Sequence, residues 1–523
     1  MCKKPMVTAI SLALGLIQIP AYAQFDATLE LSDINGQNGF VLNGVDANNY
    51  SGISVSSAGD INGDGFDDFI IGASRATVDG MFEAGSAYVV FGSGDGFPNP
   101  FNLSDINSLN GFSLNGSAQS EAVGISVSAA GDVNGDGLDD LIVGTSIAGK
   151  SYVVFGSDSQ FPNPFSSTTI NGENGFLILQ ANSNDRAGRV VSAAGDINGD
   201  GFDDIIIGAY NASPNGNQYA GSSHVIFGTD MGFPNPFELS SINALNGITI
   251  NGISAGDKLG FSVSSAGDVN GDGIDDVIVG APEVELNGDH WVGSAYVVFG
   301  SDMGLANPFN MSTLNGQNGF AILGINISDR TGDSVSAAGD VNGDGIDDLI
   351  VGVSAGGDNR TGVAYVIYGT DLGFPHPFEL SSIDALNGFT LVGIENSDQL
   401  GRSVNKAGDV NGDGIDDLIL GAWSASPNAI NDAGSSYVVY GSQSLMPNPF
   451  NLASLDGSNG FSINGINESD FSGYAVSSAG DVNDDGVDDI IIGAWRADSN
   501  GNQNSGSSYV VYGDDTIFKN SFD

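Results

Sequence analysis

One acidic, glycine-rich decapeptide, of which "GDVNGDGIDD" is the form that recurs unchanged, appears seven times in this chain of 523 residues. The copies lie at 59–68, 131–140, 195–204, 267–276, 339–348, 408–417 and 480–489. Positions are counted from the first aspartate of each copy. Oxygen-bearing groups stand at alternate positions, and the glycine at position 6 permits a tight turn. Such a loop brings several hard oxygen donors together, and this is the donor type that binds divalent cations.

The donor set of each copy suits Ca²⁺. In the fourth copy, positions 1, 3, 5, 7 and 9 are Asp268, Asn270, Asp272, the backbone carbonyl of Ile274, and Asp276. Mg²⁺ prefers fewer and more rigid protein ligands, and the loop has no thiolate or imidazole to select zinc. An EF-hand would continue to a glutamate at position 12, but Val279 stands there within an apolar run, so a strand–loop–strand site is expected.

The same assignment in all seven copies predicts about seven Ca²⁺ ions per chain. The expected ligands are Asp60, Asn62, Asp64, Phe66, Asp68; Asp132, Asn134, Asp136, Leu138, Asp140; Asp196, Asn198, Asp200, Phe202, Asp204; Asp268, Asn270, Asp272, Ile274, Asp276; Asp340, Asn342, Asp344, Ile346, Asp348; Asp409, Asn411, Asp413, Ile415, Asp417; and Asp481, Asn483, Asp485, Val487, Asp489. The alternative is a metal-free turn, because Asn and Asp favour turns in any case. The acid at position 8 is expected to be solvated or bonded to the neighbouring turn rather than to the ion.

Around each loop the same four strand-like runs recur. In the fourth copy they are 260–267, 276–281, 293–300 and 319–324, which are rich in Val, Ile, Tyr and Phe and bounded by turn residues. The first aspartates are spaced by 72, 64, 72, 72, 69 and 72 residues, which fits a four-stranded propeller blade. The sequence therefore predicts an all-β fold, a seven-bladed β-propeller. The approximate blades are 46–116, 117–180, 181–252, 253–324, 325–393, 394–465, and 466–522 with 29–44.

The two ends of the chain indicate how the ring closes. The last copy ends within the connector between the third and fourth strands, where Phe518 and Phe522 align with Phe233 and Phe237. The missing fourth strand is present at the other end, in 29–44. Joining the N- and C-terminal strands in the last blade leaves no open sheet edge. The alternative is an open array with a ragged final repeat.

Composition restricts the context and the partners. The net charge is −51, with 13 Lys and Arg against 64 Asp and Glu, which argues against nucleic acid as a partner. Residues 1–23 resemble a signal peptide cut after Ala23, and no later run is long enough for a transmembrane anchor. The only cysteine, Cys2, would leave with that signal. We therefore expect a secreted or periplasmic domain, 24–523, without disulfides.

These motifs resemble the FG-GAP repeats of the integrin α-subunit β-propeller and, more closely, secreted bacterial proteins built from such repeats. The segment 259–263, "LGFSV", matches the first half of the motif and 279–282, "VGAP", the second; the other copies are degenerate. The resemblance implies a calcium loop between the first and second strands of each blade, on the lower face. It implies the scaffold and not integrin-type signalling.

The histidines do not belong to a recognisable catalytic motif. His224, His290 and His376 have no nucleophile motif beside them, and no "HExxH" is found. His224 stands where other copies have tyrosine, which indicates packing at the edge of the core. A glycosidase needs only two suitably spaced carboxylates and stays open as an alternative.

Recognition is expected on the upper face, opposite the calcium loops, where the connecting loops vary in length. The candidate ligand-binding residues there are Tyr210, Trp291, Arg360, Trp423, Trp495 and Arg496. Arginine and aromatic side chains are enriched at recognition surfaces. The alternative is that strands and acidic loops exclude basic residues, which then collect in the remaining loops by default.

The sequence as a whole predicts an exported calcium-binding propeller that acts as a binding or adhesion module for a protein or glycan. A structural subunit of a surface or periplasmic assembly is the second interpretation, and a secreted hydrolase is the third.

Overall fold

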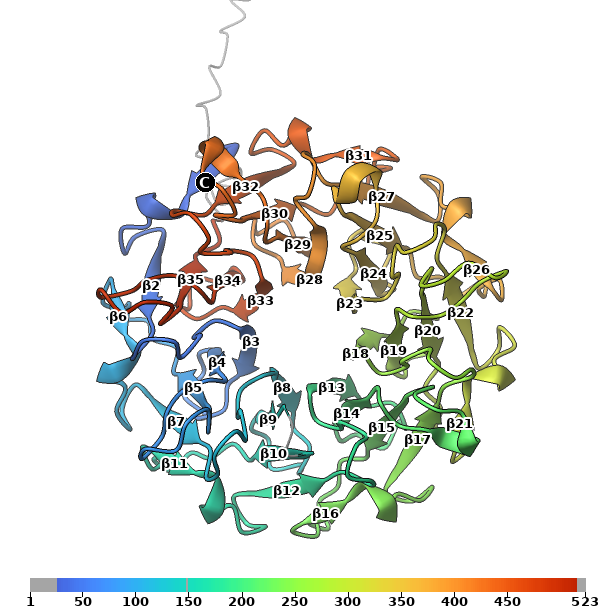
Figure 1. Ribbon diagram of the computed structural model, residues 1–523, viewed down its shortest axis with the longest axis horizontal. Helices are drawn as coiled ribbons and strands as arrows, with labels where there is room; N and C mark the ends of the chain where they lie inside the picture. The colour runs from blue at the N-terminus through green and yellow to red at the C-terminus, as the bar shows by residue number, and fades with distance from the viewer. Residues whose placement is uncertain (1–25, 147–148, 515–523) are drawn as a thin grey trace, which may run out of the picture.

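The structure, a computed structural model, describes residues 26–146 and 149–514. These residues form seven five-stranded sheets arranged as blades around a central axis (Figure 1). The prediction of an all-β, seven-bladed propeller is confirmed. The predicted signal peptide and the two C-terminal phenylalanines used to align the last connector lie outside the described residues.

Blades are numbered here from the one that contains the first decapeptide. The innermost strands of blades 1 to 7 are β3 (Ser54–Gly59), β8 (Val127–Gly131), β13 (Val190–Gly195), β18 (Ser262–Gly267), β23 (Ser334–Gly339), β28 (Leu400–Gly408) and β33 (Ala475–Gly480). The second strands are β4 (Asp68–Ala73), β9 (Asp140–Gly144), β14 (Asp204–Ala209), β19 (Asp276–Ala281), β24 (Asp348–Val353), β29 (Asp417–Ala422) and β34 (Asp489–Ala494).

The next strands outward continue each blade by antiparallel pairing. The third strands are β5 (Ser86–Val90), β10 (Lys150–Val154), β15 (Ser222–Ile226), β20 (Ser294–Val298), β25 (Val363–Ile367), β30 (Ser435–Val439) and β35 (Ser507–Val511). The fourth strands are β7 (Gly111–Asn115), β12 (Gly175–Leu179), β17 (Gly247–Asn251), β22 (Gly319–Leu323), β27 (Gly388–Val392), β32 (Gly460–Asn464) and, in blade 7, β2 (Gly39–Asn43).

A short fifth strand completes each blade and was not anticipated from the sequence, which predicted four. In blades 1 to 7 it is β11 (Phe165–Ser166), β16 (Phe237–Glu238), β21 (Phe309–Asn310), β26 (Phe378–Glu379), β31 (Phe450–Asn451), β1 (Thr28–Glu30) and β6 (Phe101–Asn102). It pairs in parallel with the fourth strand but comes from the connector of the next blade around the ring, as when Phe237 pairs with Ile178. Each blade is therefore hydrogen-bonded to its neighbour at the outer edge.

The helices among the described residues are single 3₁₀ turns of three residues. They are η1 (Leu31–Asp33), η2 (Leu103–Asp105), η3 (Ser167–Thr169), η4 (Pro214–Gly216), η5 (Leu239–Ser241), η6 (Met311–Thr313), η7 (Asp358–Arg360), η8 (Leu380–Ser382), η9 (Pro427–Ala429) and η10 (Leu452–Ser454). None of them has the length and hydropathy of a membrane span.

The predicted closure of the ring is confirmed. Strand β2 pairs antiparallel with β35, from Gly39 opposite Val511 to Asn43 opposite Ser507, and β1 adds to β32 of blade 6. Figure 1 shows the blue N-terminal strand beside the red C-terminal blade. Phe40 and Leu42 of β2 are fully buried in a cluster that joins blades 7 and 1. The N-terminus therefore supplies the strands that would otherwise leave two blades with exposed edges.

The hydrophobic core lies between blades. Each second strand is buried along its whole length, as in β19 and β24, because it is covered on both faces. One cluster joins Ile278 and Val297 of blade 4 to Leu349 and Val351 of blade 5, and equivalent clusters lie between the other neighbours. This packing fixes both rims of the ring, where the loops of interest lie.

Candidate functional site

The seven decapeptide loops connect the first and second strands and lie together on one face, here called the lower face. In the fourth loop, Asp268 accepts hydrogen bonds from the backbone N–H groups of Asp272 (3.0 Å) and Gly273 (2.7 Å). Asp272 in turn accepts from the N–H of Ile274 at 3.1 Å. These bonds use the backbone donors of the loop, and each carboxylate oxygen retains lone-pair capacity for a further partner.

The aspartate at position 9 is the most buried member of each loop. Asp276 is fully buried and accepts hydrogen bonds from the backbone N–H groups of Gly300 (2.8 Å) and Val269 (3.2 Å). Burial raises the pKa of its equivalents Asp68 and Asp204 to about 9; backbone hydrogen bonds oppose this, and repulsion from the acids at positions 5 and 1 adds to it. A carboxylate in this setting is costly as an anion unless a cation compensates it.

The aspartate at position 8 bonds the neighbouring blade. Its Oδ2 accepts a hydrogen bond of 2.8–3.0 Å from the backbone N–H of the first aspartate in the preceding loop. The seven pairs are Asp139–Asp60, Asp203–Asp132, Asp275–Asp196, Asp347–Asp268, Asp416–Asp340, Asp488–Asp409 and Asp67–Asp481. Of the two roles expected for this acid, the structure shows the bond to the neighbouring turn.

The glycine before each loop is required by this bond. Gly267 has a φ of +69°, and a Cβ on it would lie 2.3 Å from Oδ2 of Asp347. A side chain there would therefore displace the carboxylate that connects two blades. This explains why "GD" opens every copy of the decapeptide.

The donor chemistry of the loops fits Ca²⁺, although in residues 26–146 and 149–514 no three His, Cys, Asp or Glu side chains are grouped closely enough to hold a metal by themselves. The expected set also uses an asparagine oxygen and a backbone carbonyl. In the sixth loop, Oδ1 of Asn411 is buried without a hydrogen-bond partner, while its amide nitrogen donates to Asp417. A buried oxygen of this kind needs a donor or a cation.

The upper face is formed by the loops that enter each first strand and by those between the second and third strands. Its residue types vary more from blade to blade than those of the lower face. The loop into each first strand holds a non-glycine residue in the left-handed region at the equivalent position in all seven blades. These residues, with φ between 54° and 62°, are Tyr50, Ala122, Arg186, Lys258, Arg330, Gln399 and Phe471. Backbone strain of this kind concentrates at functional sites, and here it fixes the direction of seven different side chains.

Five aromatic side chains of blades 6, 7 and 1 form one continuous cluster on this face. This aromatic cluster consists of Tyr50, Trp423, Phe471, Tyr474 and Trp495. Phe471 lies between the two tryptophans, with ring centroids 5.0 Å from Trp423 and 6.0 Å from Trp495, and Tyr50 meets Trp495 at 4.6 Å. The indole nitrogens of both tryptophans are buried and find no acceptor among the described residues.

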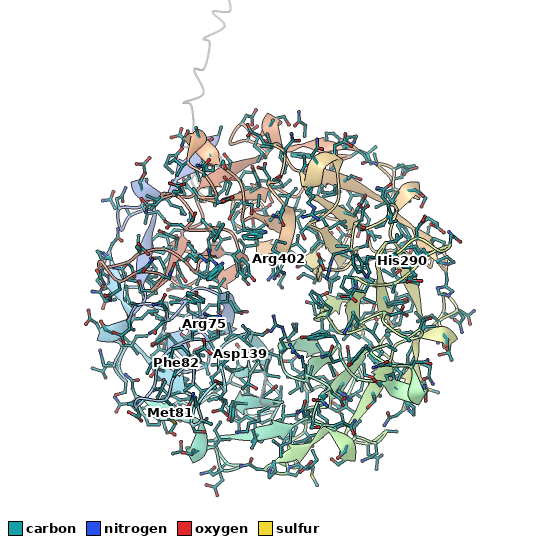
Figure 2. The ribbon with its side chains drawn as sticks, viewed as in Figure 1. Arg75, Met81, Phe82, Asp139, His290 and Arg402 are labelled. Atoms are coloured by element: carbon teal, nitrogen blue, oxygen red, sulfur yellow. The ribbon has the colours of Figure 1, made fainter. Side chains whose placement is uncertain are left out.

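Three arginines lie against this cluster. The guanidinium of Arg496 lies 4.4 Å from the centre of the Trp495 ring, that of Arg402 lies 5.0 Å from Tyr474, and that of Arg75 lies 4.6 Å from Tyr50. Figure 2 shows Arg402 at the edge of the central opening. A cavity of about 300 Å³ in the channel is lined by Arg402 and Tyr474 on one side and by residues of the other blades.

The structure brings together only part of the residue set expected from the sequence. Trp423, Trp495 and Arg496 share one cluster, although Phe471 and Tyr474 stand between the tryptophans. Tyr210 lies apart, with its ring 5.7 Å from Phe261 and its hydroxyl accepting from Arg186. Trp291, which is 52% exposed, and Arg360 lie in loops of blades 4 and 5.

Sequence reasoning missed Tyr50, Phe471 and Tyr474. Tyr50 of blade 1 and Phe471 of blade 7 occupy the same position of the repeat, three residues before the position at which Tyr474 of blade 7 lines the channel. An alignment of the repeats could therefore have pointed to these residues. Ser74, Ser146 and Ser354 stand where the sixth and seventh blades have tryptophan. The aromatic cluster is therefore confined to one arc of the ring.

The histidines are engaged in packing or hydrogen bonds. Burial lowers the pKa of His224 to about 4, and its Nδ1 lies 3.1 Å from the hydroxyl of Thr249. His290 pairs with Glu285, and His376 accepts from the backbone N–H of Ala321. His224 is therefore a packing residue, as expected.

A comparison with known protein families finds one match along the chain. The chain matches the FG-GAP repeat at 51–90, 123–154, 187–226, 259–298, 331–367, 401–439 and 472–511. The chain belongs to the FG-GAP repeat family. Each matched segment covers the first three strands of one blade, apart from Leu400 at the start of β28, and includes the decapeptide that joins the first two strands.

Curated relatives include two kinds of protein. The chain is 31% identical to integrin alpha pat-2 of Caenorhabditis elegans over 251 residues, 46% of this chain, and 27% identical to integrin alpha-5 of Xenopus laevis over 268 residues, 50% of this chain. It is also 31% identical to phosphatidylinositol-glycan-specific phospholipase D of Bos taurus over 185 residues, 35% of this chain. The alignments span 18%, 22% and 20% of these FG-GAP relatives.

Proposed function

We propose that this FG-GAP protein is an exported, calcium-stabilised propeller whose upper face binds a protein or glycan ligand in adhesion or attachment. The observation that carries the proposal is the break in sevenfold symmetry on the upper face. Five aromatic residues and three arginines gather over blades 6, 7 and 1, whereas the equivalent loop positions of blades 1, 2 and 5 hold serine. Similarity to integrin α subunits supports a binding role.

Calcium is proposed as part of the scaffold. Seven buried position-9 aspartates lie close to the acids at positions 1 and 5, and divalent cations would remove that repulsion. The residues that would hold each ion are those at positions 1, 3, 5, 7 and 9. When bound, the ion supplies positive charge and cross-links each loop; the ligand surface on the opposite face does not need it directly.

The aromatic cluster is tested by the double variant Trp423→Ala and Trp495→Ala. Binding is to be measured first on arrays of immobilised glycans and extracellular proteins, with wild-type chain in calcium buffer. Truncation of aromatic hot spots commonly costs about 2 kcal/mol or more, so the double variant should lose binding by about thirtyfold or more.

A separate measurement distinguishes recognition from packing. If the tryptophans serve recognition, melting temperature and calcium content should stay close to those of the wild type. If they only cap the core, stability falls while binding per folded molecule is unchanged, and the proposal fails. Tyr210→Ala, on the opposite arc of the same face, is the matched control.

A hydrolytic role is the second candidate, because one relative is a phospholipase D. The alignment covers 20% of that enzyme, so its activity does not transfer to this chain by similarity alone. Hydrolysis of a phosphatidylinositol-glycan substrate by the purified chain would favour this candidate over a binding module.

A further inference from the structure

Most of the basic residues that the structure describes form no ion pair with a carboxylate. The protein has 64 acidic and 13 basic residues, so each base has about five acids available. Of the ten Lys and Arg residues that the structure describes, three pair with a carboxylate within 4 Å: Arg75, Lys150 and Arg330. Arg402 and Arg496 have no such partner. Arginines that stay unpaired in so acidic a chain point to an anionic ligand from outside the chain.

Aromatic stacking holds these arginines in place without saturating their donors. The arginine cluster is defined as Arg402 and Arg496, from blades 6 and 7; Arg75 of blade 1 also lies against the aromatic cluster but pairs with Glu83 at 3.5 Å. Arg496 lies over both Trp495 (4.4 Å) and Phe471 (5.0 Å), and one N–H of Arg402 donates to the hydroxyl of Tyr474 at 3.1 Å. Stacking on a ring orients the guanidinium plane, and most of its five N–H donors stay available.

A carboxylate that acts on Arg402 is already engaged. Asp333, which interacts electrostatically with Arg402, accepts from Nε of Arg330 at 3.1 Å and from the hydroxyl of Ser354 at 3.1 Å. The repeated acids of the decapeptides lie on the opposite rim of the ring. At physiological salt, charges separated by more than about 8 Å are largely screened, so the lower face does not cancel the upper one.

We propose that the arginine cluster binds carboxylates of an acidic polypeptide segment. This deepens the proposed function and rests on it. A planar guanidinium fork matches a carboxylate with two parallel hydrogen bonds. A peptide is favoured over a glycan because guanidinium groups cover the faces of Trp495 and Tyr474 on which a sugar ring would stack. Mixed Arg, Trp and Tyr surfaces are also typical of protein interfaces.

The test uses full-length protein in calcium buffer and fluorescein-labelled hexaglutamate, with binding followed by fluorescence anisotropy. Labelled hexalysine and polygalacturonate are the comparison probes. Wild type should bind hexaglutamate, and the double variant Arg402→Ala and Arg496→Ala should weaken it by about tenfold or more, as expected when charge-assisted hydrogen bonds are lost. Lys406→Ala removes one positive charge at the lower end of β28 and should change affinity by less than about twofold.

Conservative variants test the geometry. Arg402→Lys and Arg496→Lys together keep the charge but remove the forks, and should weaken binding several-fold. Full affinity in the lysine variant would overturn the proposed bidentate recognition. Melting temperatures of all variants in calcium establish that the loss is not unfolding.

Other outcomes also overturn the inference. They are no binding of hexaglutamate at about 1 mM, an unchanged affinity in the alanine double variant, or arginine-dependent binding of polygalacturonate alone, which would assign the surface to a glycan. A tryptophan-dependent ligand that carries no carboxylate would defeat this inference and leave the proposed function standing. Loss of tryptophan dependence on the arrays would defeat the proposed function instead.

Discussion

The two faces of the ring differ in how strictly they follow the repeat. On the lower face, all seven loops have the same Asp or Asn residue at positions 1, 3, 5, 8 and 9, and each position-8 aspartate accepts the same hydrogen bond from the preceding blade. On the upper face, equivalent positions hold serine in some blades and tryptophan in others. Residues that are the same in every blade are suited to what every blade needs, which is stability and closure of the ring. Residues confined to one arc are suited to an asymmetric role, such as binding a ligand.

This contrast also divides the charges. The seven lower loops hold 29 of the 64 acidic residues, whereas the arginine cluster lies on the upper face. A lower-face change should therefore affect folding and ion content, and an upper-face change should affect binding. The predictions that follow are arranged from the largest expected effect to the smallest.

Removing the N-terminal strands should have the largest effect. A chain that begins after residue 44 lacks β1 and β2, which leaves edges open in blades 6 and 7 and removes buried Phe40 and Leu42. The expected loss of stability is above about 5 kcal/mol, with aggregation through the exposed edges. Size-exclusion chromatography and thermal melting measure both. A shorter deletion that removes β1 alone is the control: it opens the edge of blade 6 but keeps buried Phe40 and Leu42, so it should lose less stability and aggregate less.

Chelation should have the next largest effect. With a Kd of ~10⁻⁴ M and about 2 mM free calcium, each loop would gain about 1.8 kcal/mol of stability. Seven such loops sum to about the whole stability of a typical domain. Excess chelator should therefore lower the melting temperature strongly, and re-added calcium should restore it. A melting curve that is unchanged by chelator would contradict the structural role of calcium, and magnesium at equal concentration is the control.

Two aspartates of the fourth loop should behave differently. Asp272→Ala removes a proposed ligand and should lower the ion count by one. Asp275→Ala should keep the count but lose the bond to the N–H of Asp196, which costs about 1–3 kcal/mol when that donor is left unpaired. Asp275→Asn retains an acceptor oxygen and should recover most of the loss. Equal ion counts in both alanine variants would mean that the ligands are assigned wrongly.

The seventh loop offers the smallest test. Asp484 stands where the other loops have glycine and has a φ of 58°. Asp484→Gly should stabilise the protein by up to about 1 kcal/mol, because glycine adopts this conformation without strain. The reverse change in the sixth loop, Gly412→Asp at a φ of 71°, should destabilise by a similar amount. Denaturant midpoints measure both; a loss of stability in Asp484→Gly would contradict this reading.

The sequence was sufficient for the fold because the repeat, its spacing and the displaced terminal strand at 29–44 each carried a clear signal. The fifth strand could not be predicted from the sequence, because two residues such as Phe237 and Glu238 show no periodicity and their pairing is set by the neighbouring blade. The role of the position-8 acid was left open for the same reason: its partner lies in another repeat. Tyr50 and Phe471 were missed because both occupy a loop position with positive φ, and residue type does not reveal such a position.

The central claim is that every lower loop is an ion site and that the upper face is not. It is tested most directly by counting bound calcium per folded chain, by equilibrium dialysis, in the wild type and in the Trp423→Ala and Trp495→Ala double variant. The account predicts close to seven ions for both proteins, one for each decapeptide. One ion or none in the wild type, or a reduced count in the double variant, would contradict it.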